Sequence, residues 1–383
     1  MAFAATNNLF RTTISKANLW LCIALVAISA ILEWSSFRYI KYLVSFLAIF
    51  IVISKQNSLK IHIPEAVYPF LLLISYGILN VYSANFGGIK DLFFIFSGVV
   101  VFLCIKKTYI NLIHVNYLIF ILFFLLTPDL ASFSLNSFSL KDSTSFIDYE
   151  TNISSILGMF ALLALYHKNF FLLIFNILLM LVNMKRISLL ALLVVLILWF
   201  IPKKISCIFL NKYSMVFINL MFLCLLYLFG KGYFDTYLQQ ILGMSSKWLS
   251  MGRTVLYQGV LNEMSTDFFS MIFGFGSGSA YPLTLHSLDF SDGVNYPNLH
   301  SDILKIFFEY GFVIFGIFFF FLYRTKHLFQ KYLALYLNIL FLCDNVLVFS
   351  HVLFFYFLIQ MFYDLNSGHC NPNHRTIYIE VPG

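Results

Sequence analysis

Apolar runs nearly as long as a membrane helix recur along the whole sequence, and they limit its fold more than any other feature. Of the 383 residues, 61% are hydrophobic and 11% are charged, whereas a soluble domain carries roughly 25% charged residues. Inside lipid a helix satisfies its own backbone hydrogen bonds, and it needs about 20 residues to cross. We therefore predict one all-α integral membrane domain over residues 1–383.

The spacing of these runs predicts a polytopic bundle of about 12 transmembrane helices. The first run follows Arg11 and Lys16 and resembles a signal peptide, but many similar runs follow it, so we interpret it as an uncleaved helix. The predicted helices begin near Leu19, Tyr39, Val67, Leu92, Leu112, Asn152, Phe170, Ile187, Ser214, Ile303, Tyr332 and Val348.

The cations lie at the ends of the apolar runs and cluster on alternate loops. The formal net charge is +7, but the cations are spread along the chain, so we expect membrane lipid as their partner and no nucleic acid. The positive-inside rule then places both termini in the cytoplasm. The cations on the predicted cytoplasmic loops are Lys55, Lys60, Lys106, Lys107, Lys168, Lys203, Lys204, Lys212, Arg324, Lys326 and Lys331.

The longest loop, residues 231–300, falls on the opposite, non-cytoplasmic face. It is too short for an ordinary independent domain, so we expect it to lie on the neighbouring helices. Two apolar stripes predict amphipathic helices within it, and Gly274, Gly276 and Gly278 end the pattern. The stripes are Phe234, Tyr237, Leu238, Ile241 and Leu242, and then Leu249, Leu256, Val260 and Met264.

The sequence predicts no metal site and no cofactor. The run from Gly274 to Gly278 lacks the preceding strand and the following Lys-Ser/Thr of a nucleotide loop. His369, Cys370 and His374 in the tail have no specific ligand spacing. The cysteines are interpreted as buried small hydrophobic residues, without disulfide or metal spacing. They are Cys22, Cys104, Cys207, Cys224, Cys343 and Cys370.

Three cations lie at positions where a positive charge is energetically unfavourable. Lys185 and Arg186 occupy a short loop on the predicted outer face, where they either reach lipid headgroups or bind an anionic phosphate. Arg253 shares the apolar stripe of Leu256 and Val260, so its guanidinium falls on a face expected to be buried. It either binds a helix carbonyl or carboxylate, or forms bidentate bonds to phosphate oxygens.

His300 ends the long loop directly before a strongly apolar helix, so we expect it at the membrane boundary. Imidazole titrates near neutral pH and can accept a proton from a sugar hydroxyl, which is the task of a general base. A histidine at such a boundary can also be purely structural. The sequence alone leaves both interpretations open.

The order of these features resembles the O-antigen polymerase and O-antigen ligase superfamily of lipid-linked glycan transferases, over residues 181–323. The most specific match is His300-Ser301-Asp302, followed by Leu304 and by Glu309-Tyr310-Gly311, which is similar to the family's "HN-D-x-L … E-x-G" run. Ser301 stands where the family commonly has Asn. The other matching pieces are Lys185 to Leu190, Gly252-Arg253 and Phe273 to Gly278.

This resemblance implies a GT-C-like fold in the bacterial inner membrane, with the long loop on the periplasmic face. It also implies an undecaprenyl-pyrophosphate-linked oligosaccharide as the donor, with no nucleotide sugar or metal. It implies that Arg186 and Arg253 hold the pyrophosphate and that His300 is the catalytic base. Further substrate-binding candidates are Lys185, Asn298, Asp302, Glu309 and Asp344.

Three functions fit the resemblance or the helical pattern. An O-antigen polymerase, which joins repeat units and can work with a chain-length regulator protein, is favoured by the Phe, Ile and Lys-rich character and the His300-Ser301-Asp302 variant. An O-antigen ligase would transfer the glycan to lipid A core. A flippase or transporter would not need a long loop closed by a histidine, and the sequence shows no pair of broken helices in corresponding halves.

The predicted topology can be checked with reporter fusions along the chain. We expect fusions at Lys107 and Lys204 to report the cytoplasm and a fusion at Ser277 to report the periplasm, because cations favour cytoplasmic loops. A cytoplasmic signal at Ser277 would contradict the periplasmic site.

Overall fold

A computed structural model describes most of the chain and contains helices as its regular elements, apart from one isolated parallel bridge between Val81 and Ser277. The prediction of an all-helical fold is therefore confirmed for the described residues. These are residues 16–33, 35–54, 65–82, 86–103, 110–127, 152–183, 185–243, 246, 253–264, 267–286, 299–325 and 327–366. Outside them lie Arg11, Lys55, Lys60, Cys104, Lys106, Lys107, Leu249, Gly252, Asn298, Lys326, His369, Cys370 and His374.

The chain divides into two compact units that alternate along the sequence. Unit 1 comprises residues 1–67, 97–193 and 349–383, and unit 2 comprises residues 68–96 and 194–348. The prediction of a single membrane domain over residues 1–383 stays a prediction.

The helices of unit 1 are α1 (Lys16–Ile31), η1 (Ser36–Tyr39), α2 (Ile40–Ser54), η2 (Glu65–Val67), α5 (Leu112–Leu126), α6 (Ile153–Tyr166), α7 (Phe170–Val182) and α18 (Ser350–Asn366). Those of unit 2 are α3 (Tyr68–Leu79), α9 (Lys203–Phe209), α10 (Lys212–Gly230), α11 (Asp235–Leu242), α13 (Arg253–Met264), α14 (Phe268–Phe273), α15 (Ala280–His286), α16 (Asp302–Leu322), α17 (Leu328–Cys343) and η6 (Val346–Val348). Two helices, α4 (Gly87–Leu103) and α8 (Arg186–Phe200), run from one unit into the other.

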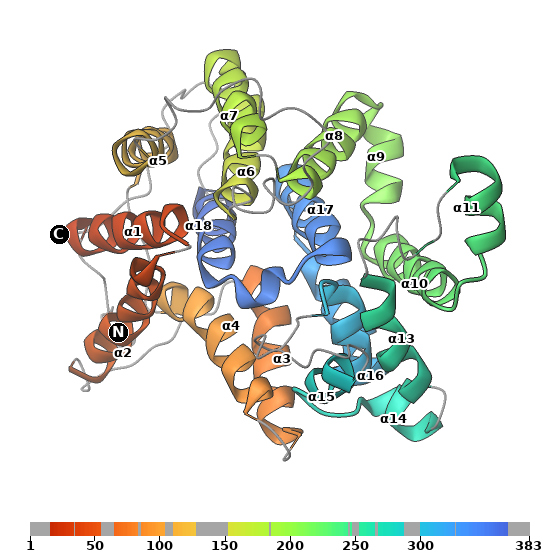
Figure 1. The fold of residues 1–383 in the computed structure, drawn as a ribbon. Helices are drawn as coiled ribbons and strands as arrows, with labels where there is room; N and C mark the ends of the chain where they lie inside the picture. The colour runs from red at the N-terminus through yellow and green to blue at the C-terminus, as the bar shows by residue number, and fades with distance from the viewer. Residues whose placement is uncertain are drawn as a thin grey trace, which may run out of the picture. The chain divides into compact units, whose positions relative to one another are not determined.

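Helix α6 forms the centre of unit 1, where it packs against α7 and α18 (Figure 1). Every residue from Ile153 to Leu165 is buried, which fits a helix that is apolar around its whole circumference. The ring centroids of Phe160 and Phe355 lie 5.9 Å apart and join α6 to α18.

The opposite face of α7 exposes a stripe of large apolar side chains at helical spacing. Phe170, Phe171, Ile174, Leu178 and Leu181 are each between 46% and 71% exposed. A contiguous apolar surface of this kind is unfavourable in water and suits contact with lipid tails. The exposed stripe therefore agrees with a membrane environment for α7.

Two of the described helices, α10 and α16, are long and apolar enough to cross a membrane by length and composition. The other apolar helices are shorter, so the count of about 12 transmembrane helices stays a prediction. Helices do begin within a few residues of all the predicted starts.

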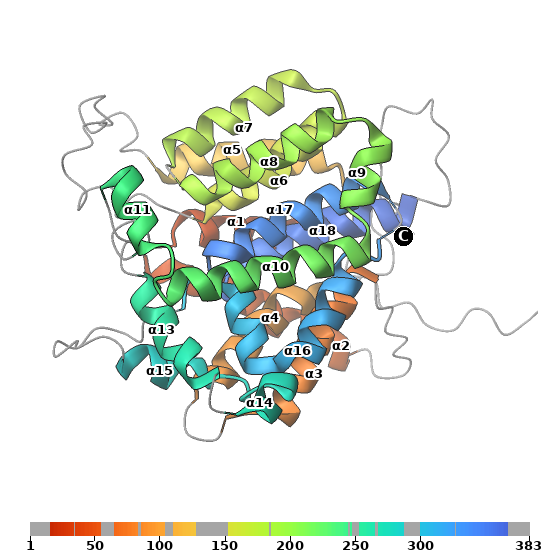
Figure 2. The same ribbon diagram turned by 90° about the vertical axis from the view of Figure 1, so that its right-hand side faces the viewer.

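Helix α16 is the centre of unit 2 and contacts α3, α10, α14, α15 and α17 (Figure 2). It is broken at Gly311, whose φ of 78° and ψ of 172° are not helical. The break takes the carbonyls of Phe308 and Glu309 out of the regular hydrogen-bond ladder. They accept instead from the backbone N–H groups of Phe275 at 3.0 Å and Gly276 at 3.1 Å.

We call residues 274–278 the glycine loop, and it fits tightly against the break. Gly274, Gly276 and Gly278 all have positive φ. A Cβ on Gly274 would meet the carbonyl oxygen of Glu309, and a Cβ on Gly311 would meet the nitrogen of Gly274. Glycine is required at both positions because only it tolerates both the dihedral angles and the close approach.

The other side of the glycine loop pairs with the connection between α3 and α4. Ser277 donates its N–H to the Asn80 carbonyl at 2.8 Å and accepts from the Tyr82 N–H at 3.0 Å. A Cβ on Gly88 would meet the Ser277 carbonyl oxygen. The loop thus holds α16 and the α3–α4 connection together.

The loop over residues 231–300 contains α11, α13, α14 and α15 among its described residues, which confirms the prediction of helices there. Leu256 and Val260 are buried on α13, and Tyr237 and Ile241 are exposed on α11. The predicted stripe on α13 is therefore a packing face, whereas part of the stripe on α11 is not.

Replacing Gly311 with Ala tests the break in α16. We expect Gly311→Ala to destabilise the protein by roughly 3 kcal/mol or more, because Ala disfavours these dihedral angles and its Cβ would collide with the glycine loop. Gly316→Ala is the matched control in the same helix, where a Cβ would meet nothing within 4 Å. Thermal unfolding of the purified protein in detergent should show a much lower melting temperature for Gly311→Ala and an unchanged one for Gly316→Ala. Equal melting temperatures for the two variants would contradict the role of Gly311 in the break.

Candidate functional site

The start of α16 brings His300 next to α13. His300 is half-buried and has a φ of 53°, a left-handed conformation that is uncommon outside glycine. The Tyr257 hydroxyl donates to the His300 backbone carbonyl at 3.3 Å. Burial raises the pKa of the Tyr257 phenol, so its hydroxyl stays protonated and remains a donor. The backbone of His300 is thus held in place from α13.

Arg253 begins α13 and reaches the end of α17. Its Nη1 donates to the Cys343 carbonyl at 2.9 Å, which is the helix-carbonyl alternative that the sequence left open. A guanidinium has five N–H donors, so this bond by itself does not use up the capacity of Arg253 for an anionic ligand. The pyrophosphate role of Arg253 remains a prediction.

Asp302 is fully buried where α16 meets the end of α17. Its Oδ2 accepts from the Leu347 N–H at 2.8 Å, and its own N–H donates to the Asp344 carbonyl at 3.2 Å. Its Oδ1 has no hydrogen-bond partner among the described residues. Ser301, the departure from the family pattern, is the N-cap of α16 and accepts from the Leu304 N–H at 3.4 Å. We call Arg253, Tyr257, His300, Asp302 and Asp344 the α16-start cluster.

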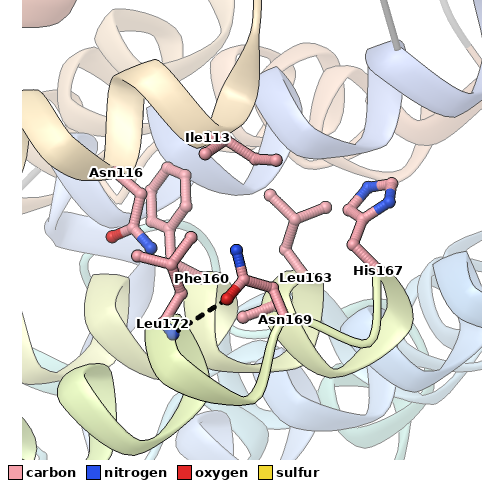
Figure 3. A pocket seen from close by; sticks show the side chains of 8 residues that line it. Ile113, Asn116, Phe160, Leu163, His167, Asn169 and Leu172 are labelled. Carbon is pink, nitrogen blue, oxygen red and sulfur yellow. Dashed lines mark hydrogen bonds between the residues drawn. The ribbon is translucent and has the colours of Figure 1, made fainter. Parts of the chain in front are cut away.

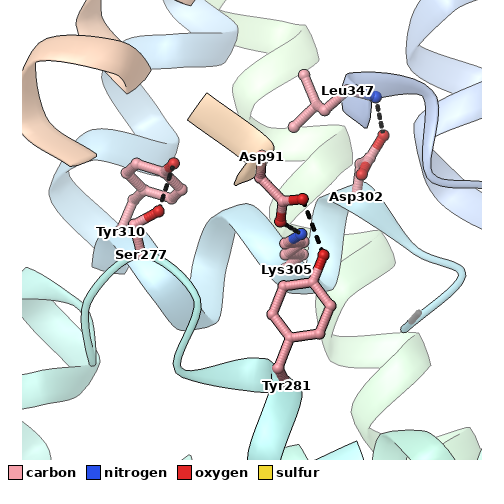
Figure 4. A network of polar contacts seen from close by, with 7 residues as sticks. All are labelled: Asp91, Ser277, Tyr281, Asp302, Lys305, Tyr310 and Leu347. Carbon is pink, nitrogen blue, oxygen red and sulfur yellow. Dashed lines mark hydrogen bonds and ion pairs between the residues drawn. The ribbon is translucent and has the colours of Figure 1, made fainter. Parts of the chain in front are cut away.

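One turn further along α16, Lys305 forms a buried ion pair with Asp91 of α4 (Figure 4). The Tyr281 hydroxyl of α15 donates to the other Asp91 oxygen at 2.8 Å. The Lys305 Nζ also lies 5.0 Å from the centroid of the Tyr281 ring. These contacts tie α4, α15 and α16 together.

Glu309 adds a second carboxylate to this network. It is 1% exposed and interacts with the charge of Lys305 and with the backbone N–H groups of Gly278 and Ala280. Neither carboxylate oxygen has hydrogen-bond geometry to a donor in the described part of the chain. Glu309 thus faces the glycine loop from a buried position, and its substrate-binding role remains a prediction.

The sequence analysis missed Asp91, Lys305 and Tyr281. A usable signal was present, because Asp302, Lys305 and Glu309 follow the i, i+3, i+7 spacing of one helix face within an apolar helix. Ionisable residues inside such helices usually have a partner or a function. The partner Asp91 lies 214 residues away in the sequence and could not be identified from spacing.

Lys185 and Arg186 belong to unit 1 and have different environments. Lys185 is buried and donates to the Asn152 Oδ1. Asn152 in turn donates to both Glu33 oxygens, at 2.9 Å from its backbone N–H and 2.5 Å from its side chain. Arg186 begins α8, as predicted, and is exposed. Asn298 lies outside the described residues.

A small pocket in unit 1 lies among α5, α6 and α7 (Figure 3). Ile113, Phe160 and Leu163 give it an apolar wall, and none of the predicted site residues lines it. Burial lowers the pKa of the His167 imidazole at its edge, which favours the neutral form. The described residues that line the pocket include no Lys or Arg that could bind a phosphate.

The two helices of membrane length and the exposed apolar stripe of α7 are consistent with a helical membrane protein. Polar groups gather at the start of the broken helix α16. Residues 169–321 match the protein family described as O-antigen ligase. This match supports the resemblance of this part of the chain to the O-antigen polymerase and ligase superfamily. No curated protein and no solved structure matches the chain.

The buried ion pair leads to a stability prediction. We expect Lys305→Met to lower the free energy of unfolding by about 3–5 kcal/mol, because it leaves Asp91 and Glu309 buried without their cation. Adding Asp91→Leu should recover part of this loss, since the double variant removes both partners of the pair. Thermal unfolding in detergent measures both effects, with exposed Lys204→Met as the control. Equal melting temperatures for the single and double variants would count against the pairing.

Proposed function

We propose that the protein is an O-antigen polymerase that joins undecaprenyl-pyrophosphate-linked oligosaccharide repeat units at the periplasmic face of the bacterial inner membrane. The observation that carries the proposed class of enzyme is the family match over residues 169–321, which include Arg186, Arg253 and His300. The choice of polymerase over ligase rests on the Phe, Ile and Lys-rich character and the His300-Ser301-Asp302 variant. Both termini would be cytoplasmic, and about 12 helices would cross the membrane. A chain-length regulator protein is a further expected partner.

In the proposed reaction His300 takes the proton of an acceptor sugar hydroxyl. The hydroxyl oxygen then attacks the anomeric carbon of the donor glycan, and the bond from that carbon to the pyrophosphate breaks. Undecaprenyl pyrophosphate leaves with the electron pair. Because pyrophosphate is a good leaving group, the protein must mainly hold it with cations and supply the base.

Two features of unit 2 support the role of His300. Its backbone is bound by the Tyr257 hydroxyl, and it precedes α16, whose start is fixed through Asp302 and Leu347. A base held by packed elements needs less reorganisation during the reaction. Arg253 lies on the same helix as Tyr257 and would supply a cation near this base.

The second candidate function is an O-antigen ligase, which would move the finished glycan onto lipid A core. The description of the matched family favours it, because that description names the ligase. A flippase is a third candidate. The broken helix α16 resembles the interrupted helices of transporters, but a single break is not the pair that such folds use.

The lipopolysaccharide ladder of a strain that lacks the gene separates these candidates. A polymerase predicts core with one repeat unit, a ligase predicts core with none, and a flippase predicts lipid-linked repeats retained on the cytoplasmic side. Wild-type protein should restore the long ladder in every case.

His300→Ala tests the proposed chemistry in the same strain. We expect the rate of glycan transfer to fall by ~10²–10⁴-fold, the usual loss when a general base is removed. The protein should remain normally abundant, and the core should carry a single repeat unit. Exposed His114→Ala, which lies outside the matched residues, is the control and should restore the ladder. A normal ladder from abundant His300→Ala protein would refute the catalytic role.

A further inference from the structure

Helix α9 of unit 2 joins two apolar helices, α8 and α10, and is itself almost entirely exposed (Figure 2). Of its seven residues only Ser206 is buried, and the Ser206 hydroxyl donates to the Leu198 carbonyl at 2.9 Å. The next buried residue is Leu210, directly after the helix. A helix this short is not stable in water by itself, so a surface other than the described protein core must stabilise α9.

The exposed side chains of α9 have an amphipathic arrangement. Ile205, Ile208 and Phe209 follow the i, i+3, i+4 spacing of one helix face and are 44%, 67% and 48% exposed. Lys203 and Cys207, at i and i+4, lie on the opposite face and are also exposed. A helix with an uncovered apolar face and a basic opposite face suits the boundary between the acyl chains and the headgroups of a membrane.

The charge of α9 complements an anionic surface. Lys203 and Lys204 are both exposed, and neither has an ion-pair partner among the described residues. The sequence contains no Asp or Glu between Glu150 and Asp235, so this part of the chain supplies no carboxylate for them. Basic side chains next to an apolar helix face are attracted to anionic lipid headgroups.

The adjoining helix ends have the residues of a membrane boundary. The ring centroid of Trp199, near the end of α8, lies 5.0 Å from that of Tyr332. Lys212 begins α10, and its Nζ lies 5.1 Å from the centroid of the Tyr213 ring, which is 66% exposed. Trp, Tyr and Lys are enriched where a helix leaves the hydrocarbon. Because α10 is long and apolar enough to cross a membrane, its first residues fit the membrane surface.

We infer that α9 is an interfacial helix that binds the anionic surface of the membrane. Its three apolar side chains insert among the acyl chains, and Lys203 and Lys204 contact the phosphate groups of anionic phospholipids. The lysines belong to a loop that we predict to be cytoplasmic. This contact is the same for a polymerase, a ligase or a flippase, so it does not depend on the proposed function.

Such an anchor would set the depth of α10 in the bilayer. Helix α9 is followed by the buried Leu210 and by Asn211, whose side chain caps α10 by accepting from the Tyr213 N–H at 3.2 Å. This short, capped connection couples the position of α9 to that of α10. Helix α10 packs against α13 and α16, so the anchor would also hold these two helices at a fixed depth.

Tryptophan substitutions on the two faces of α9 test its insertion. Ile208→Trp and Phe209→Trp place the probe on the apolar face, and Cys207→Trp is the matched control on the opposite face of the same helix. The full-length proteins are placed in phosphatidylcholine nanodiscs with and without bromine on the acyl chains, and the fluorescence added over the wild type is measured. We expect brominated chains to quench the two probes on the apolar face, and aqueous iodide to quench mainly Cys207→Trp, because each quencher acts only on contact.

Lysine substitutions test the preference for anionic lipid. The variants are Lys203→Gln and Lys204→Gln, and Lys203→Arg and Lys204→Arg are the controls that keep the charge. We expect increasing fractions of phosphatidylglycerol in the nanodiscs to raise the melting temperature of the wild type and the Arg variants. The midpoint of this rise should move to a roughly 5-fold higher fraction in each Gln variant. Without anionic lipid all five proteins should melt at the same temperature, because both lysines are exposed.

Four results would overturn the interfacial assignment. Quenching of Ile208→Trp by iodide but not by brominated chains would place α9 in water, and quenching by neither would mean that protein covers it. An unchanged phosphatidylglycerol response in both Gln variants would exclude the anionic headgroups. A lysine-dependent shift with inorganic phosphate in phosphatidylcholine nanodiscs would instead indicate a site for a soluble anion. None of these measurements follows glycan transfer, so the ladder of the deletion strain still tests the proposed function separately.

Discussion

The break in α16 at Gly311 creates two carbonyls that must find new donors in an apolar interior, and the glycine loop supplies them. An unsatisfied backbone carbonyl in such surroundings costs several kcal/mol, so separating the loop from the helix would be strongly unfavourable. The contact also fixes other elements. Ser277 of the same loop pairs with the α3–α4 connection, and α15, which carries Tyr281, follows the loop directly. The ion pair between Lys305 and Asp91 thus lies beside a loop that is already anchored on two sides.

The polar groups of the two units differ in kind. Among the described residues of unit 2, the buried carboxylates Asp91, Asp302 and Glu309 outnumber the buried cation Lys305, whereas the buried lysines Lys41 and Lys185 lie in unit 1. Carboxylates accept hydrogen bonds from hydroxyl groups, and cations bind phosphate oxygens. Both kinds of group would serve the proposed transfer of sugars from a lipid pyrophosphate. The proposal agrees with the family that residues 169–321 match.

The candidate site could be predicted in part, because some of its residues can be recognised from their position next to an apolar run. Arg253 and His300 stand directly at helix starts, and the structure places both in the α16-start cluster. Arg253 also shows the limit of such reasoning. Its guanidinium binds the Cys343 carbonyl, a contact with a helix end 90 residues away that the sequence offered only as one of two alternatives.

The sequence by itself determined where the helices lie, because the helices follow from apolar runs and from the polar residues that separate these runs. Both signals are local and extend over one or two helical turns. It also determined that the long loop would contain helices and that its glycines would interrupt them. Only the tertiary structure decided which charges meet. The partners in Lys305–Asp91 and Lys41–His351 are 214 and 310 residues apart, and the dihedral angles of Gly311 depend on a loop from another part of the chain. Hydrophobicity is a property of each segment alone, whereas the pairing of buried polar groups depends on which segments pack together.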